Sequence, residues 1–531
     1  SRTALPRQQT LRAVVDWSYE LLFDDEQRVF ERLSAFPGGC DLATAEAVCA
    51  DETLAAADLA DHLHALVDKS LVVAAPTGDG VRFTQLQTLA QYGRERLTER
   101  GDAVRTRDAM ARHYAELCAE SAAAFTGDRQ RAWLTAMDQE HDNLRAALDW
   151  AVANDDAETA LMIAGGASWP HWLRGTVFEG KRWLDDAFAC GGEADERTRA
   201  LALTGRGLID FLSGKPEHSD EDLEAAIEIF QRHDDVESLA LAHSFYAEQP
   251  AALGDIDEAR RRRLKMLDRF ATLPKDRFNV ASRSYSQAKL AIIDGDLGAA
   301  ERHYRAATEG FAHLDRPVMN SMCLGMVADF DERAGDFPAA ISALEAAIET
   351  NQTLLGGFTG SLLARLGWVL LEDGQFARAE AVYQQALASG RRVQHTMVVF
   401  LSLTGVAALD RINRRDDAAE AAAGEALEIY RAGGPRRFRN RVDTAADLQA
   451  AAALCCVVLG VIAAERDDAE RAATLLGQAE RLRADAGAEV PTFQRDDVDR
   501  ARDAAVGALG PAGFLAAFER GRLGGELAPS Y

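Results

Sequence analysis

The sequence predicts an all-α chain, in which a small N-terminal domain with one β-hairpin precedes a long superhelix of helical hairpins. A short pattern of turn, aliphatic and small residues recurs at Gly254, Gly295, Gly335, Gly374 and Arg414, so successive copies lie 41, 40, 39 and 40 residues apart. A fixed period of this length is typical of stacked two-helix units. The composition agrees, because only 7% of the 531 residues are aromatic and 13 are prolines. The first hundred residues lack the repeat.

The N-terminal hundred residues show helical spacing of apolar side chains and then a change of period. Val29, Phe30 and Leu33 mark one face of a helix that begins at Asp24. Two short apolar runs, 71–74 and 81–83, flank a turn rich in Pro, Gly and Asp, which indicates a β-hairpin. Helices followed by such a ribbon describe a winged helix. The other helices predicted here cover residues 11–22, 44–50, 58–69 and 86–100.

A winged helix suggests DNA binding, but the candidate recognition helix argues against it. Residues 58–69 carry Asp58, Asp61 and Asp68 against a single Lys69. A helix that reads the major groove needs Arg, Lys, Asn or Gln side chains at base edges and cations near the phosphates. We therefore expect this helix to pack inside the protein, with no direct contact to nucleic acid.

Charge and cysteine usage narrow the class of protein further. The net charge of -26 disfavours wrapping nucleic acid or lying on an anionic membrane. Seven scattered cysteines without a CxxC motif or a Cys/His quartet predict buried, reduced thiols and no metal site. The longest apolar window, residues 450–464, is shorter than a membrane-spanning helix requires. We expect a soluble, cytoplasmic protein.

The chain divides by its patterns into three parts. Residues 1–105 form the predicted winged-helix domain, and residues 106–155 form connecting helices, expected over 107–124 and 130–152. Residues 156–531 form the repeat domain. Early copies of the repeat are expected near residues 175–184 and 214–216, because these positions precede the next turn by 39 and 40 residues.

In detail the repeat resembles the tetratricopeptide (TPR) motif. In the copy around Gly374, Gly367 lies in the first helix, Ala379 follows the turn, and Tyr383 lies in the second helix. Small residues let the two helices approach closely, and large ones fill the remaining space. Because the period near 40 exceeds the usual 34 residues, we expect longer helices or wider loops than in a standard TPR.

Several segments resemble parts of a known family. The first, ALPRQQTLRAVVDWSYELL at residues 4–22, is similar to the stretch after the nucleotide-binding core in STAND-class signalling ATPases. The subgroup that it resembles contains the AfsR-like and MalT/LuxR-like transcriptional regulators of actinobacteria. The other segments that carry the resemblance are residues 30–39, 66–72, 86–93, 140–148 and 475–480.

The resemblance implies that separate domains bind the nucleotide and sense the signal. In such regulators a P-loop ATPase precedes a winged helix and a TPR-like superhelix, which senses an inducer or a partner protein. This segment has no GxxxxGK[ST] motif, so it is not expected to be an enzyme by itself. ATP or ADP is expected only with an upstream nucleotide-binding domain. Some relatives place a histidine on ADP just after the hairpin, but residues 84–87 contain none, and a LuxR-type helix-turn-helix is not expected after the repeats.

The first helix of each TPR pair lines an inner groove, and carrying those positions over gives the candidate binding residues. Trp368 is central, because an aromatic ring flanked by charges of both signs can hold a peptide or a small amphiphile. The other candidates are Tyr285, Lys289, Asp329, Arg333 and Arg411, with Ser282, Met322, Glu332, Ser361, Glu372 and Thr404 beside them.

Two basic runs stand out in the acidic chain. Residues 260–263 are four arginines within a helix, and a Pro/Gly loop between repeats carries Arg436, Arg437, Arg439 and Arg441. Such a loop can meet acidic protein or nucleic acid, but pairing with the surplus carboxylates of the chain is favoured.

The leading hypothesis is therefore the regulatory sensor region of a STAND-type ATPase that controls transcription. The solenoid would bind a small-molecule inducer or a protein partner, and the winged helix would pack against the ATPase domain. Two alternatives stay open: a stand-alone TPR adaptor and a winged-helix DNA-binding protein.

Overall fold

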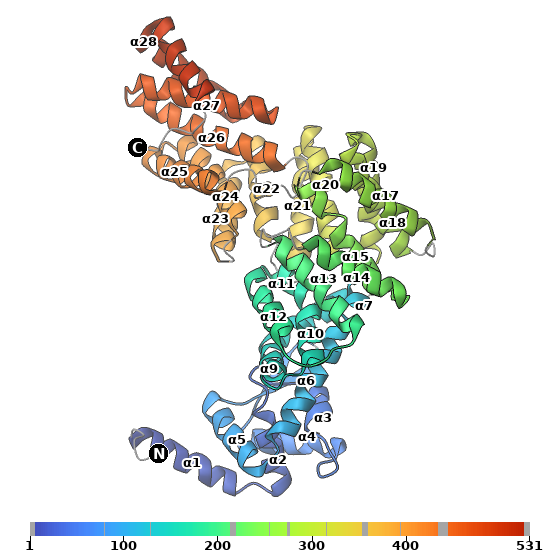
Figure 1. Cartoon of the computed structure of the whole chain (residues 1–531). Coiled ribbons are helices and arrows are strands. Elements are labelled where there is room, and N and C mark those ends of the chain that lie inside the picture. Colours follow the sequence, from blue (N-terminus) through green and yellow to red (C-terminus); the bar gives the residue numbers. More distant parts are fainter. Residues whose placement is uncertain are drawn as a thin grey trace. The chain divides into compact units, whose positions relative to one another are not determined.

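The computed structural model describes residues 6–78, 80–127, 129–212, 219–253, 255–272, 277–314, 316–352, 359–392, 395–433 and 444–524. The chain forms two compact units, Ser1–His171 with Val177–Ala242, and Trp172–Thr176 with His243–Tyr531. Apart from one β-hairpin, the elements in the described ranges are helices (Figure 1). The predicted all-α class is confirmed, and residues 106–155 lie within the first unit.

The first unit begins with a helical module that carries the hairpin and continues into helical pairs. Helices α11 (Ser168–Arg174) and α15 (Val236–Tyr246) each contain residues of both units. The other elements of the first unit are α1 (Pro6–Glu20), α2 (Asp24–Leu33), α3 (Leu42–Cys49), η1 (Ala56–Asp58), α4 (Leu59–Asp68), β1 (Val73–Thr77), β2 (Gly80–Thr84), α5 (Gln87–Arg100), α6 (Ala103–Ala119), α7 (Ser121–Thr126), α8 (Gln130–Gln139), α9 (His141–Ala153), α10 (Ala157–Gly166), α12 (Val177–Ala189), α13 (Glu196–Leu212) and α14 (Ser219–Arg232).

The core of the N-terminal module forms where α2 packs on α3, α4 and α5. Leu59, Leu63 and Leu66 of α4 are fully buried and form the apolar face of this helix. The hairpin pairs antiparallel from Val73 opposite Thr84 to Thr77 opposite Gly80. Its first strand starts two residues later than predicted, because the Leu71 and Val72 amides donate to the Leu66 carbonyl and close α4.

The second unit is a series of antiparallel helix pairs. Within it α18 packs on α19, α20 on α21, α22 on α23 and α24 on α25, and each pair also packs on the next. The predicted TPR-like superhelix is thereby confirmed. Its elements are α16 (Gln249–Leu253), α17 (Ile256–Thr272), α18 (Arg277–Ile293), α19 (Leu297–Ala312), α20 (Pro317–Arg333), α21 (Phe337–Gln352), α22 (Thr359–Glu372), α23 (Phe376–Arg392), α24 (Thr396–Ile412), α25 (Asp416–Gly433), α26 (Thr444–Glu465), α27 (Ala469–Ala486), η3 (Thr492–Gln494) and α28 (Arg495–Leu523).

The predicted period is visible in the turns between paired helices. Gly295, Gly335 and Gly374 adopt left-handed conformations with φ of 77°, 77° and 76°. At Gly295 the amide donates to the Ile292 carbonyl at 3.1 Å, and the next amide donates to the Ala291 carbonyl at 2.9 Å, which closes the preceding helix. Asp296 then caps the following helix, since its carboxylate accepts from the Ala299 amide at 2.9 Å. The turn thus ends one helix and begins the next.

The same turn occurs where the sequence has no glycine. Asp155, Asp234 and Asp467 also have positive φ values, of 55°, 52° and 62°. Aspartate is one of the few side chains that tolerate this conformation. In each case a second aspartate follows and caps the next helix; these residues are Asp156, Asp235 and Asp468. A search for Asp-Asp pairs would have found these copies.

Large residues of the second helices fill the space between pairs at the same period. Tyr304, Leu344 and Tyr383 are buried and lie 40 and 39 residues apart. The Tyr383 ring fits against Gly367 of α22 and Gly405 of α24, where an added Cβ would lie 2.8 Å and 2.1 Å from ring atoms. This confirms the close helix approach that the TPR-like pattern predicts.

Helix α26 is apolar on all sides. Its Leu448–Glu465 window has a mean hydropathy of 2.0 and is long and apolar enough, by length and composition, to cross a membrane. The apolar stretch is therefore longer than the window of residues 450–464 predicted from the sequence. However, 72% of this window is buried inside the protein, where α26 packs on α24, α25, α27 and α28. Such burial is typical of the central helix of a helical domain.

The last two helices, α27 and α28, cross with their backbones very close together. A Cβ at Gly477 of α27 would lie 2.0 Å from the Phe518 carbonyl oxygen, and one at Gly521 of α28 would lie 1.9 Å from the Thr474 carbonyl oxygen. Only glycine permits so close an approach at these two positions. Between the helices, Gly487 with a φ of 64° turns the chain back toward the first helices of the preceding pairs.

Candidate partner-binding surface of the helical repeats

The candidate residues on α20 and α22 form one polar cluster. Arg365 of α22 pairs with Asp329 and lies 3.9 Å from a Glu332 carboxylate oxygen, both on α20. The indole Nε1 of Trp368 donates to Glu332 at 2.8 Å. Asp329, Glu332 and Arg365 keep about a fifth to a quarter of their side-chain surface exposed. This group, called the α20–α22 cluster below, unites the predicted Asp329 and Trp368 with an arginine that the sequence analysis omitted.

The Trp368 ring is covered on one side by a segment from the C-terminal part of the chain. Phe493 of η3 meets it edge to face, with ring centroids 6.2 Å apart and planes at 72°. Glu372, one helical turn after Trp368, has a buried carboxylate oxygen without a hydrogen-bond partner. Burial raises the pKa of Glu372, and the positive charge of Arg495 opposes that rise. At this end of the cluster, the Trp368 ring therefore lies one helical turn from the Glu372 carboxylate, which is poorly solvated.

Tyr285 and Lys289 lie in a second cluster, where α18 meets α17. The Lys289 ammonium donates to Glu248 at 3.0 Å, and the guanidinium of Arg263, on α17, reaches the other oxygen of Glu248 at 2.7 Å. Tyr285 is 8% exposed and packs edge to face on Tyr304, with ring centroids 6.0 Å apart. Lys289 is thus the accessible member of the predicted pair, and Tyr285 belongs to the core.

The charges around Glu248 make this cluster dependent on pH. Burial disfavours the ionised carboxylate, but the charges and hydrogen bonds of Lys289 and Arg263 outweigh burial and lower the pKa of Glu248 to about 2. A group with a lowered folded-state pKa stabilises the fold fully above its unfolded value, 4.5, and loses that contribution as the pH falls toward the folded value.

We expect Glu248→Gln to lower the free energy of unfolding of the second unit by roughly 2 kcal/mol at pH 7, allowing for partial exposure. The difference from the unsubstituted chain should shrink steadily below pH 4.5, because the carboxylate that the variant lacks is then being protonated. Urea titrations across this range measure it, with the exposed Glu349→Gln as the matched control. A difference that does not vary with pH would contradict the assignment.

Arg411 is engaged in several ion pairs. Its side chain is 4% exposed, and it pairs with Asp416 at 2.8 Å, with Glu465, and with Asp497 of α28 at 3.5 Å. A buried guanidinium shared by three carboxylates joins helices and leaves little of itself for a partner. Arg411 therefore ties α24 to α26 and to the start of α28.

The remaining candidates differ in how far they can be placed. Arg333 is exposed in the last turn of α20. Arg436, Arg437, Arg439 and Arg441 lie outside the described residues. In the other basic run Arg260 pairs with Asp294 at 2.8 Å, while Arg261 and Arg262 each pair with Glu258 at 2.7 Å. Carboxylates of the chain thus pair with three arginines of residues 260–263, and the pairing expected for the 436–441 loop stays a prediction.

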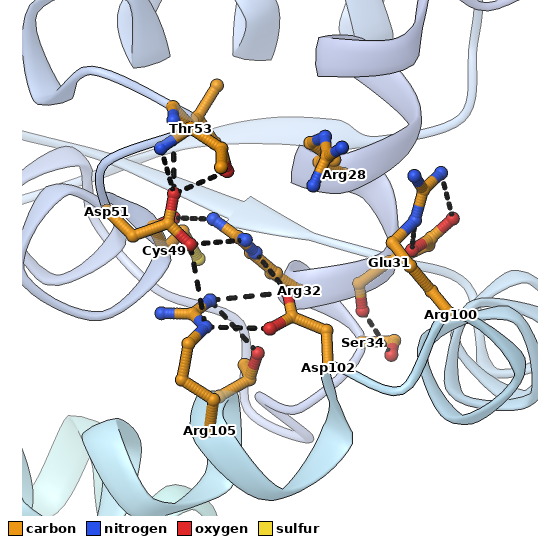
Figure 2. A network of polar contacts seen from close by, with 12 residues as sticks. Arg28, Glu31, Arg32, Ser34, Cys49, Asp51, Thr53, Arg100, Asp102 and Arg105 are labelled. Atoms are coloured by element: carbon orange, nitrogen blue, oxygen red, sulfur yellow. Dashed lines mark hydrogen bonds and ion pairs between the residues drawn. The ribbon is translucent and has the colours of Figure 1, made fainter.

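The first unit contains polar networks of a structural kind. Figure 2 shows Arg32 of α2 enclosed between Asp51 and Asp102, which it reaches at 2.6 Å and 2.7 Å, while Arg105 binds the same Asp102. Burial alone would raise the pKa of Asp51, but hydrogen bonds from Thr53 and Arg32 hold it well below its ordinary value. These groups satisfy one another and join α2, α6 and the loop after α3.

A second buried network, missed from the sequence, joins the hairpin to the helices that follow. Arg82 of β2 binds Glu140 at 2.7 Å and donates to the Gly38 and Gly39 carbonyls at 2.7 Å and 2.9 Å. Asn143 of α9 donates to the Gly39 carbonyl at 2.8 Å and accepts from the Gly38 amide at 2.9 Å. We name this group the Arg82–Glu140 junction. An indication of this junction was present in the sequence, because the two segments that meet here, residues 30–39 and 140–148, both carry the family resemblance.

Tyr114 of α6 completes the Arg82–Glu140 junction. Its hydroxyl donates to the second Glu140 oxygen at 2.6 Å and accepts from Asn143 at 2.9 Å. Burial and the Glu140 charge raise the pKa of Tyr114 well above its ordinary value, so it stays protonated and can donate. Hairpin, α6 and α9 are therefore fixed to one another by hydrogen bonds with few exposed atoms.

The groups of the α20–α22 cluster have the chemistry of a contact surface. Within the described ranges, no group of three His, Cys, Asp or Glu side chains could hold a metal ion. Six of the seven cysteines are buried, and burial raises the pKa of thiols such as Cys118 and Cys323. The α20–α22 cluster offers charges of both signs beside an indole ring, which are groups that recognise a partner.

Comparison with known proteins supports part of this reading. The tetratricopeptide repeat family matches residues 321–392, the part of the chain that holds the α20–α22 cluster. A Mycobacterium tuberculosis protein named "Putative HTH-type transcriptional regulator Rv0890c" is 39% identical over 207 residues, which are 38% of this chain and 22% of that protein. The chain thus spans about a fifth of the length of this relative. A second M. tuberculosis protein, named uncharacterized, is 38% identical over 101 residues, 19% of this chain and 26% of that protein.

Solved structures with similar helical folds have low sequence identity. A Pyrococcus horikoshii "Signal Transduction ATPase with Numerous Domains (STAND) protein with a tetratricopeptide repeat sensor" is 13% identical, with a TM-score of 0.42 over 78% of this chain and 64% of that one. A Rap protein complexed with Competence and Sporulation Factor is 13% identical, with a TM-score of 0.45 over 71% of this chain and 99% of that one. The chain therefore contains tetratricopeptide repeats and is homologous to part of a protein named as a transcriptional regulator.

Proposed function

We propose that this chain is the sensor region of a STAND-type ATPase of the AfsR-like and MalT/LuxR-like group, which controls transcription in the cytoplasm. In this proposal the repeats bind an inducer or a protein partner. The N-terminal module acts as a winged helix that restrains a nucleotide-binding core, where ATP or ADP would bind. The observation that carries the proposal is the α20–α22 cluster on the first helices of successive repeats.

The cluster has the composition of a recognition surface. Arg365 and Glu332 each keep 24% of their side-chain surface exposed, and Glu332 accepts the hydrogen bond of the Trp368 indole. An aromatic anchor within a ring of partly exposed charges provides both contact area and orientation for a ligand. Charges that already pair with one another also keep the surface ordered before a ligand arrives, which lowers the entropic cost of binding.

The sequence relationship supports the regulatory part of the proposal. The homologous protein is named as an HTH-type transcriptional regulator, and this chain corresponds to about a fifth of its length. This relationship fits a regulatory role for the chain. ATPase activity and control of target genes are properties that we propose for the larger regulator and not for the described residues.

An exposed apolar stripe supports docking of the N-terminal module onto another domain. Val14, Trp17 and Leu21 follow helical spacing along α1 and its end, and Trp17 is 64% exposed. Phe23, just beyond, is 77% exposed. A continuous apolar stripe of this kind marks a protein contact more often than a solvated face. In the proposal this stripe packs on the nucleotide-binding core.

Helix α4 does not favour the DNA-binding alternative. Its three leucines are buried, and the acidic Asp61 and Asp68 are exposed. A surface of this charge repels phosphate instead of neutralising it. We therefore do not propose nucleic acid as a partner of this module.

The proposal is tested in the longer protein by deleting residues 243–524 and measuring nucleotide turnover and transcription of the target with and without inducer. We expect the response to inducer to disappear and the basal turnover to change, because a sensor must bind the two states of the ATPase with different affinity. Unchanged turnover and unchanged activation would contradict the sensor role and would favour a stand-alone adaptor.

A further inference from the structure

The inner surface next to the α20–α22 cluster is already occupied by the chain itself. After α27 the chain turns at Gly487, continues through Pro491 and forms η3, which packs on α22. Phe493 packs against the apolar core built from α20 to α24 and meets the Trp368 ring edge to face. Gln494, the next residue, is buried. A short segment remote in sequence therefore covers the central candidate residue of the surface.

One charged residue of the same segment also meets a group of opposite charge on a first helix. The Asp497 carboxylate lies 3.5 Å from Nε of Arg411, on α24. Arg495, between them, is about half exposed and lies 3.6 Å from the Glu489 carboxylate of its own segment. An aromatic and an anionic side chain thus lie four positions apart, at 493 and 497, and each has a complementary group, Trp368 on α22 and Arg411 on α24.

We propose that residues 491–497 are an internal ligand of this surface, and that the external ligand is a protein segment of the same chemistry. That segment carries an aromatic side chain for Trp368 and, four residues later, an acidic residue near Arg411. The inference rests on the proposed sensor function, because it names the ligand class of that same surface. An incoming segment must displace the internal one.

Residues 491–497 are attached to the surface that they cover through the chain itself, and this attachment explains why such a site would respond only to a suitable partner. A segment held in the same chain competes at an effective concentration on the order of millimolar. The apparent affinity of an external segment is reduced by the fraction of molecules in which the site is open. Loosening the internal ligand should therefore raise the affinity for an external one without any change in the receptor residues.

Binding of a fluorescein-labelled peptide with the sequence of residues 488–500, followed by fluorescence anisotropy, tests this directly. We expect weak binding to the unsubstituted chain and at least about tenfold tighter binding to Phe493→Ala, in which the Trp368 ring is uncovered. The matched control is Leu515→Ala, which removes an exposed apolar side chain from α28 and should bind as weakly as the unsubstituted chain.

Two further comparisons show whether the peptide occupies the proposed place. The same peptide with alanine in place of Phe493 should lose its binding to the Phe493→Ala chain, and adding Trp368→Ala to that chain should abolish binding of the original peptide. Equal binding of both peptides, or no binding to the opened chain, would overturn the proposal. Dimerisation of the unsubstituted chain that is lost in Trp368→Ala would also overturn it, because the segment would then dock in a second copy.

A measurement on the unsubstituted chain keeps the test valid if a variant fails to fold. Excess unlabelled peptide should accelerate amide hydrogen exchange in residues 490–498 and leave exchange in α22 slow, since one occupant replaces the other. Unchanged exchange at saturating peptide would contradict the proposal. None of these readouts needs nucleotide or DNA, so their failure would leave the sensor role standing, and loss of the sensor role would leave this binding intact.

Discussion

Replacing Glu140 by alanine should open the N-terminal half of the first unit. The substitution leaves the Arg82 guanidinium, the Tyr114 hydroxyl and the Asn143 amide buried without their shared acceptor. Breaking a buried ion pair by removing one partner costs about 3–5 kcal/mol. We expect the free energy of opening for the hairpin and α9 to fall by about 3 kcal/mol or more, which is roughly a hundredfold in the opening equilibrium.

Hydrogen exchange followed by mass spectrometry measures this change segment by segment. Exchange should accelerate in residues 73–84 and 141–153 together, because the Arg82–Glu140 junction holds both. The matched control is Glu116→Ala, an exposed glutamate on α6 two residues after Tyr114. Acceleration confined to one of the two segments would show that the junction does not couple them.

The second large effect is expected from Tyr383→Ala in the repeat core. The Tyr383 side chain is 2% exposed and separates α22 from α24 by packing on Gly367 and Gly405. Truncating a buried aromatic side chain costs about 3–5 kcal/mol, through lost burial and the cavity that remains. We expect the second unit to unfold at a lower urea concentration by a corresponding amount, while Tyr383→Phe, which keeps the ring, stays near the unsubstituted value.

A double-mutant cycle tests the ring–glycine contact itself. Gly405→Ala places a methyl group into the Tyr383 ring and should destabilise the unsubstituted chain. In the Tyr383→Ala background the same methyl group enters the space that the ring has left, so its effect should be smaller or favourable. Additive effects would contradict the packing, because residues in contact are expected to couple.

The repeat architecture could be predicted because its physical cause is local. A left-handed turn needs glycine or a tolerant polar residue, and a helix start needs a cap, so both leave a mark at a fixed period. The copies at Asp155, Asp234 and Asp467 escaped because aspartate took the place of glycine. The helices predicted at 44–50, 58–69 and 86–100 also have bounds within two residues of those observed, whereas α1 begins five residues before the predicted 11–22.

The surface could be predicted only in part because its occupant comes from far along the chain. Nothing near Trp368 in the sequence indicates that Phe493 will cover it, and nothing near Arg411 indicates its pairing with Asp497. The burial of a side chain also depends on residues elsewhere in the sequence. Tyr285 occupies a groove position of a TPR, yet it lies in the core because Tyr304 packs on its ring. Arg365 was omitted because standard groove positions, carried over by spacing, do not include it.

One measurement tests the central claim, that a ligand at the inner surface of the repeats controls the longer protein. Basal and inducer-dependent transcription should be compared for Phe493→Ala, Trp368→Ala and Leu515→Ala in that protein. We expect Phe493→Ala to lower the inducer concentration needed for half-maximal output by about tenfold. Trp368→Ala should remove the response, and Leu515→Ala should behave as the unsubstituted protein. An inducer response in Trp368→Ala equal to that of Leu515→Ala would contradict it.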